Sequence, residues 1–255
     1  MTGSDTKGPI RTILATLLLL VQFPVAVAAC SDPPAPSVLW IKCDKRGIDL
    51  RGADLRGAIL THTDLSGADL RNAMLSGIEL NFAKLKGSRL EGARLDNARL
   101  TSADLSGAIA PEVSLRGATL NRAQLSGADL TGADLRSASF YQADMTGVNL
   151  QRAQLQGANL SQAGLKEAKL SQADLSGANL QQAILERAVL AESTLRNANL
   201  EGASLLFADL RRADLSGASL VEAAISGAKF EGATLDMTMW INRRRCRSGS
   251  VSECR

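Results

Sequence analysis

Four cysteines are the residues of this 255-residue chain with the clearest chemistry. Cys30 and Cys43 lie near the N-terminus, whereas Cys246 and Cys254 lie within the last ten residues. Thiols can pair as disulfides in an oxidising compartment, and a cysteine behind an export signal can carry a lipid. Which of these reactions the cysteines undergo depends on the elements that position them.

Catalytic chemistry has little support in the composition. An active site needs a base, a nucleophile or metal ligands that converge in one place. The chain contains one histidine, His62, and one tyrosine, Tyr141, so neither a histidine-based triad nor a histidine metal cluster can be assembled. We therefore predict no catalytic residue, no metal site and no cofactor.

A five-residue repeat organises most of the chain. Counted every fifth residue from Leu50 to Leu235, 33 of 38 positions are leucine, and 31 of the 38 positions two residues earlier are alanine. A repeat this strict decides the architecture before any local feature does. The departures from leucine are Ala110, Phe140, Met145, Ile225 and Phe230.

A period of five suits neither regular element. In a helix, steps of five would spread the leucines around every face, and in a flat strand they would alternate between the two faces. A short extended segment followed by a bend instead returns each Ala and Leu pair to one interior. Right-angled bends close after four units, so coils of about 20 residues would stack about 4.8 Å apart.

Runs such as Ala53-Asp54-Leu55-Arg56-Gly57 and Ala128-Asp129-Leu130-Thr131-Gly132 resemble the pentapeptide repeat family, whose unit is written A(D/N)LXX. The resemblance covers residues 48–237. It implies an all-β fold, a right-handed quadrilateral β-helix of about nine coils with the leucines and alanines inside. Residues 30–47 would form an N-terminal lead-in and cap, and residues 238–255 a C-terminal cap with a basic tail.

Two places in the repeat are irregular. Ala110 replaces a leucine beside Pro111, so we expect a void with a local kink or a loosened coil there. Phe140 and Met145 occupy adjacent units, and we expect each to absorb the volume change of the other. Trp40 and Ile41 before the repeats, and Met239, Trp240 and Ile241 after them, are the expected apolar lids on the two ends.

Residues 1–29 have the features of an export signal. Lys7 and Arg11 precede an apolar stretch from Ile13 to Phe23, and small residues follow Pro24. The stretch is too short to span a bilayer, and a cleaved signal peptide fits it better. We expect an exported, periplasmic protein.

The cysteines agree with that compartment. Because the rod separates the two ends, pairing within each end is expected: Cys30 with Cys43, and Cys246 with Cys254. Residues 27–30 also resemble a bacterial lipobox with Val27 in place of the usual leucine, and lipidation of Cys30 would leave Cys43 without its partner. Disulfide and lipid at Cys30, and free thiols in the tail, remain alternatives. A membrane contact is expected only if Cys30 is lipidated.

The charge distribution limits the partners. Residues 50–237 carry 19 Lys and Arg against 21 Asp and Glu. Some members of the resembled family are acidic rods that bind DNA gyrase, and this near-neutral rod departs from them. The basic cluster in residues 243–247 has no interleaved aromatic residues, so nucleic acid is not an expected partner. Opposite charges flank single leucines, as at Asp49 and Arg51, and predict surface ion pairs.

One face offers a possible partner patch. In the four-unit register, four apolar residues fall together on successive coils of an otherwise polar rod, which favours protein contact. Phe82 and His62 form a weaker cluster on a neighbouring face. The patch consists of Ile184, Leu206, Phe207 and Ala224.

The sequence thus predicts a non-enzymatic structural or protein-interaction scaffold of the bacterial periplasm or cell envelope, with an unidentified protein partner. A lipid-anchored envelope protein that uses the rod as a spacer or surface module is the alternative. An enzyme that uses face carboxylates, such as Asp49 and Asp69 one coil apart, is the third reading, and the arginines beside both argue against it.

Overall fold

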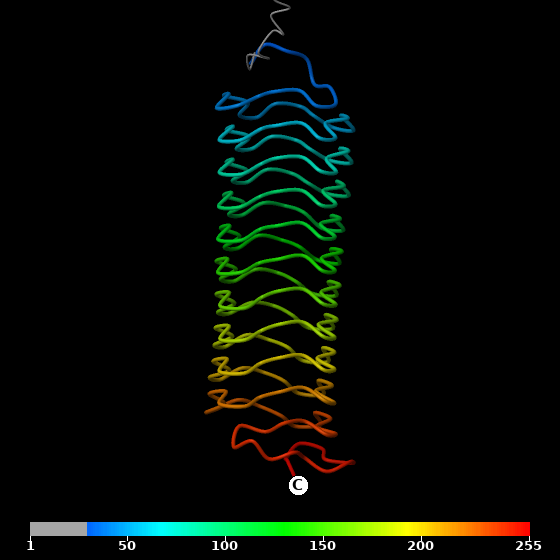
Figure 1. The fold of residues 1–255 in the computed structure, drawn as a ribbon, viewed down its shortest axis with the longest axis vertical. Coiled ribbons are helices and arrows are strands. Elements are labelled where there is room, and N and C mark those ends of the chain that lie inside the picture. Colours follow the sequence, from blue (N-terminus) through cyan, green and yellow to red (C-terminus); the bar gives the residue numbers. More distant parts are fainter. Residues whose placement is uncertain (1–29) are drawn as a thin grey trace, which may run out of the picture.

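The chain winds into a tall stack of similar coils, with the N-terminal residues at one end and the C-terminal residues at the other (Figure 1). This is a computed structural model, and it describes residues 30–255. The proposed export signal in residues 1–29 lies outside the described residues.

The coils are joined by parallel pairing at a constant offset of 20 residues. Asp49 pairs with Asp69, and Asp69 pairs in turn with Arg89. The same offset runs from Leu39 to Met239, so one coil holds four five-residue units. The four-unit coil predicted from the repeat is therefore the spacing found in the structure.

From Leu50 to Leu220, each unit makes the same set of backbone bonds. Leu50 donates its N–H to the carbonyl of Asp69 (2.7 Å), and the N–H of Asp69 donates to the carbonyl of Ile48 (2.9 Å). Within the unit, Ala53 donates to the carbonyl of Leu50 (3.0 Å), which closes a four-residue turn. The extended part is so short that the described residues contain single-residue bridges, without longer strands and without an α-helix.

The third residue of every such turn has a left-handed backbone. From Lys42 to Met237, each fifth residue has φ between +56° and +72°. A positive φ at this place is the feature of a type II turn, which explains why so many of these residues are glycine. Non-glycine residues also occupy the position, among them His62 and Phe207.

We predict that Gly177→Ala lowers the free energy of unfolding by about 1–2 kcal/mol. Gly177 has φ +65° with open space around it, so the cost comes from the backbone alone. Gly164 is the matched control, since its φ lies outside the left-handed region and an added Cβ would meet neighbours at an ordinary 3.9 Å. Urea unfolding of both variants checks this; equal losses would contradict the assignment.

Leucine and alanine fill the interior. From Ala58 to Leu220 every leucine and alanine of the repeat register is buried, and so are Phe140 and Met145. Each buried leucine contributes about 1.5–3 kcal/mol of hydrophobic stabilisation. No apolar helix long enough to cross a membrane occurs in residues 30–255.

The expected kink at Ala110 and Pro111 was wrong, because the register continues through it. Ile109 pairs with Asp129, and Ala110 is buried and donates to the carbonyl of Asp129 (2.8 Å). Pro111 stands at the second residue of the turn, whose N–H makes no backbone bond in any unit of the described chain. Val113, larger than the usual alanine and also buried, offsets the volume missing at Ala110.

The N-terminal end is closed by Trp40 and by the first disulfide. Trp40 is fully buried and donates its indole N–H to the carbonyl of Asp32 (3.2 Å), while Cys30 and Cys43 are joined with their Cα atoms 5.4 Å apart. Ile41 does not act as a lid as expected. It occupies a turn position, where side chains point outward, and it is 39% exposed.

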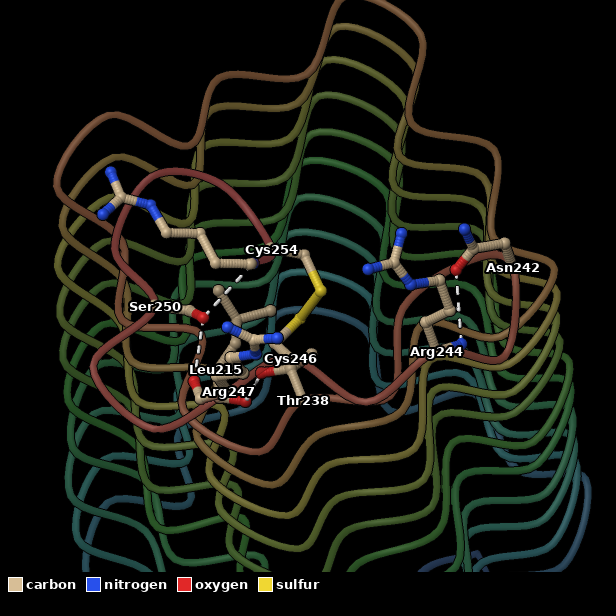
Figure 2. Close-up of a disulfide and its surroundings, with 9 residues drawn as sticks. Leu215, Thr238, Asn242, Arg244, Cys246, Arg247, Ser250 and Cys254 are labelled. Atoms are coloured by element: carbon tan, nitrogen blue, oxygen red, sulfur yellow. Dashed lines mark hydrogen bonds between the residues drawn. A yellow bond between two sulfur atoms is a disulfide. The ribbon is translucent and has the colours of Figure 1, made fainter.

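The C-terminal tail folds back over the last coil (Figure 2). Thr234 pairs with Val251, and Met239 with Arg245, both antiparallel. A disulfide joins Cys246 to Cys254, whose Cα atoms are 4.8 Å apart. Trp240 contributes to this end through an edge-on contact with Phe230. The basic tail is thus an ordered cap.

Candidate interaction surface

The four residues predicted as a partner patch come together near the C-terminal end of the rod. Ile184 pairs with Ser204, which pairs with Ala224, so the two apolar residues share one face. Leu206 and Phe207 form the turn at the edge of that face. Ile184 is 45% and Phe207 62% exposed; Ala224 is exposed, and Leu206 is half-buried.

Phe207 holds its position through its backbone and one glycine. Its φ of +57° belongs to the left-handed turn position. One coil further on, Gly227 leaves room for the ring: a Cβ added there would lie 2.5 Å from Cδ1 of Phe207. The ring therefore packs on the Gly227 backbone and stays exposed on its outer side.

Val189 extends this surface around the corner, and the sequence reasoning missed it. Val189 is 36% exposed and lies on the next face, level with Ile184 in the same coil. The five-residue spacing could have indicated it. Residues 184 and 189 pair with residues 204 and 209, and the turn that contains Phe207 lies between these two faces. We call the set the corner patch: Ile184, Val189, Leu206, Phe207 and Ala224.

The weaker cluster also forms. The rings of His62 and Phe82 stack 4.8 Å apart at an interplanar angle of 8°. Both residues occupy left-handed turn positions one coil apart. The stack covers part of each ring, although Phe82 remains 50% exposed. His62 thus makes a packing contact with Phe82 in this cluster.

Acidic and basic side chains pair along the faces as predicted. Arg51 donates from Nε and Nη2 to both oxygens of Asp49 (2.9 and 2.6 Å), and Arg56 and Arg71 do the same to Asp54 and Asp69. Arg89 reaches Glu91 at 2.7 Å. Because such pairs lie at the surface and are at most partly buried, they contribute little stability and keep the faces solvated and nearly neutral.

This pairing makes the carboxylates poor acid catalysts. The Arg51 guanidinium lowers the pKa of Asp49 to about 2, and Arg71 likewise lowers the pKa of Asp69. A catalytic acid requires the opposite shift. Among residues 30–255, no group of three or more His, Cys, Asp or Glu side chains could hold a metal ion.

We predict that Arg51→Gln returns the pKa of Asp49 from about 2 toward its ordinary 3.8. A carboxyl with a depressed folded pKa stabilises the fold above its unfolded value, and this contribution disappears as the pH falls from about 4 to about 2. Carboxyl ¹³C shifts followed against pH measure both values. A wild-type pKa near 4 would show that the pair does not persist in solution.

A hollow on another corner was not predicted from the sequence. It is lined by Asp96, Asn97, Gly117 and Ser137 with two arginines beside them. Arg136 is bound to Asp134 at 2.6 Å, and Arg116 lies 3.8 Å from the same carboxylate. The two arginines of the hollow therefore lie beside the Asp134 carboxylate, and Asp96 accepts a hydrogen bond from the Ser114 hydroxyl.

The architecture is that of a solenoid repeat protein. Pentapeptide repeats match the chain in eight copies, over residues 48–81, 78–117, 98–136, 114–152, 168–205 and 207–236. The chain belongs to the pentapeptide repeat family, as the resemblance indicated, and its fold is that family's β-helix. No curated protein matches it.

One solved structure at 32% identity agrees with this assignment. HetL, a pentapeptide repeat protein involved in heterocyst differentiation regulation from the cyanobacterium Nostoc sp. strain PCC 7120, is 32% identical, with 81% of this chain and 92% of HetL covered and a TM-score of 0.55. QnrB1, a plasmid-mediated fluoroquinolone resistance protein, is 18% identical over 77% of this chain and 91% of its own, with a TM-score of 0.42. A pentapeptide repeat protein from the Arabidopsis thaliana thylakoid lumen is 32% identical, with 38% of this chain and 65% of that protein covered and a TM-score of 0.30.

Proposed function

We propose that this protein is a non-enzymatic structural or protein-interaction scaffold that works outside the cytoplasm, in the periplasm or cell envelope. The corner patch is the observation that carries the proposal, because it gathers apolar side chains on a rod whose faces are otherwise polar and charge-paired. The partner is a protein; the paired charges on the rod give no support to nucleic acid binding.

The proposal also includes the handedness, the cross-section and the number of coils of the rod. A right-handed, quadrilateral β-helix of about nine coils fits the offset of 20 residues and the four turns per coil. Four flat faces with turns at the corners would present the patch on one edge of the rod, open to a partner from two sides.

Export is supported by the N-terminal sequence and by the disulfides. Lys7, Arg11 and the apolar stretch after them fit a signal peptide, and two disulfides fit an oxidising compartment. The Cys30–Cys43 bond competes with the alternative function, a lipoprotein anchored through Cys30, because a lipidated Cys30 has no free thiol.

The intact mass of the exported protein, before and after reduction, separates the two functions. A chain starting near Ala29 or Cys30 that gains about four hydrogens on reduction indicates two disulfides and a soluble rod. A diacylglycerol- or triacyl-sized increment on Cys30 would contradict the periplasmic proposal and favour the anchored spacer.

Leu206→Ser/Phe207→Ser tests the patch itself. Both positions are turn residues whose side chains lie outside the core, so the variant should fold like the wild type. Associations detected by chemical cross-linking in intact cells should disappear in this variant and persist in Phe82→Ser, the matched change at another corner. If both variants keep every association, the patch is not the binding surface.

A further inference from the structure

The tail covers only one half of the last coil. It bonds to two of the four faces: Leu235 donates to the carbonyl of Ser250 (2.8 Å), and Ser252 donates to that of Ala233 (2.9 Å). On the next face, Trp240 donates to Arg244 (2.7 Å). Each covered face thus offers one carbonyl and, two residues later, one N–H to an extended segment.

The other half presents the same groups without a partner. The carbonyls of Ala223 and Ala228, and the N–H groups of Ile225, Gly227 and Phe230, have no backbone bond to any of residues 30–255. Their spacing repeats that of Ala233 and Leu235 on the covered half. We call this segment, residues 223–230, the open edge.

The interior is also incompletely closed there. Ile225, Ala228 and Phe230 occupy core positions of the repeat and are only partly buried, whereas the equivalent residues one coil earlier, such as Leu205 and Leu210, are fully buried. The open edge therefore combines unpaired backbone groups with apolar side chains. An exposed edge of this kind templates the addition of a strand.

The open edge is continuous with the corner patch. Ala224 belongs to both, and the Phe207 ring lies against Gly227 on the turn between the two open faces. A segment lying along residues 223–230 would therefore pass directly beside Phe207. Lys229 and Glu231 flank the second face and would favour an acidic residue followed two positions later by a basic one.

We propose that the open edge binds an extended segment of a partner protein, which adds about ten residues as the missing half-coil. This inference rests on the proposed scaffold function and names its mode of recognition. The segment would have apolar residues five apart to cover Ile225 and Phe230. Its backbone would bond to Ala223, Ile225, Ala228 and Phe230 in parallel, as each coil bonds to the coil before it, whereas the tail on the other half runs antiparallel.

A second copy stacked through its N-terminal end fits this site poorly. Residues 30–36 precede the first coil and are held there by the Cys30–Cys43 bond. The first coil also presents the ion pairs Asp44–Arg46 and Asp49–Arg51, and charges at a sheet edge oppose such pairing. An extended segment has neither obstacle.

A synthetic peptide of residues 63–72, Thr-Asp-Leu-Ser-Gly-Ala-Asp-Leu-Arg-Asn, is the test probe. These residues lie on the same two faces of the rod as the open edge. Asp69 and Arg71 hold the positions in their coil that Lys229 and Glu231 hold in the last coil, so the peptide would place its charges beside opposite ones. The control peptide is N-methylated at the two aspartates, whose N–H groups would donate to Ala223 and Ala228. It keeps every side chain but loses those bonds.

We expect saturable binding of the probe to the full chain, with amide exchange of Ile225 and Phe230 slowed about tenfold and the methylated peptide at least tenfold weaker. In Ile225→Pro, which removes one unpaired N–H, binding should fall about tenfold. Ser226→Pro should leave binding unchanged, because Pro111 already occupies the same position of the turn.

Absence of saturation up to about 1 mM probe, or equal binding of both peptides, would overturn the inference. The exchange result requires no variant, so it stands even if Ile225→Pro fails to fold. A dimer in sedimentation, with Ile225 and Phe230 already protected, would assign the edge to a second copy and overturn the proposed occupant. If cross-links depend on the corner patch but the probe does not bind, the open edge does not recruit an extended segment. The proposed scaffold function would then remain supported.

Discussion

Replacing Leu165 by alanine is expected to lower the free energy of unfolding by about 2–5 kcal/mol. Leu165 is fully buried, and its N–H donates to the carbonyl of Ile184 (2.7 Å). Its neighbours at the same interior position of adjacent coils are Met145 and Leu185, both also buried. Each coil contacts its neighbours alone, so few other residues can move to fill the void.

Urea unfolding and amide exchange measure this effect. Because solenoids can open locally, exchange should accelerate most in the coils around residues 145–185 and little at either end. Lys166→Ala is the matched control, since Lys166 is exposed at the adjacent turn position and its change should cost less than about 0.5 kcal/mol. Equal losses of unfolding free energy in the two variants would show that the buried leucines do not stabilise the rod more than exposed turn residues do.

Removal of the C-terminal disulfide should destabilise the tail by about 2–3 kcal/mol. Cys246 and Cys254 close a short loop, and opening it restores chain entropy to the released state. Cys246 is buried and donates its N–H to the carbonyl of Thr238 (2.8 Å), so detachment exposes this end further. The open edge then extends around the whole coil, which should promote end-to-end association.

Amide exchange in Cys246→Ala/Cys254→Ala measures this release. The amides of Leu235 and Trp240 bond to the tail and should exchange roughly 30- to 150-fold faster. The Cys30→Ala/Cys43→Ala variant is the control, because that disulfide lies at the other end of the rod and should leave both amides unchanged. Unaltered exchange in the C-terminal variant would mean that the tail holds without its disulfide.

The repeat made most of the fold predictable. A period of five allows one geometry in which Ala53 and Leu55, and every pair after them, face the same interior, and the parallel pairing at 20 residues follows from it. The disulfide partners were predictable for a similar reason, because a rod keeps its two ends apart. The corner patch was predictable from the same register, apart from Val189.

Other features depended on details that a repeat does not contain. The kink expected at Ala110 is absent because Val113 offsets the lost volume and because the N–H that Pro111 lacks makes no backbone hydrogen bond at that position in other units. The half-covered C-terminal end could not be predicted either. It depends on how residues 241–255 fold back after the periodic pattern has ended.

Site-specific photo-cross-linking at position 207 in intact cells tests most directly whether this rod is a protein-interaction scaffold. Phe207 is the most exposed large hydrophobic side chain of the corner patch, and Gln142, at a left-handed turn position of another corner, provides the control. The scaffold function predicts a discrete protein adduct from position 207, absent from position 142 and located outside the cytoplasm. No adduct at 207, or the same adducts from both positions, would contradict it.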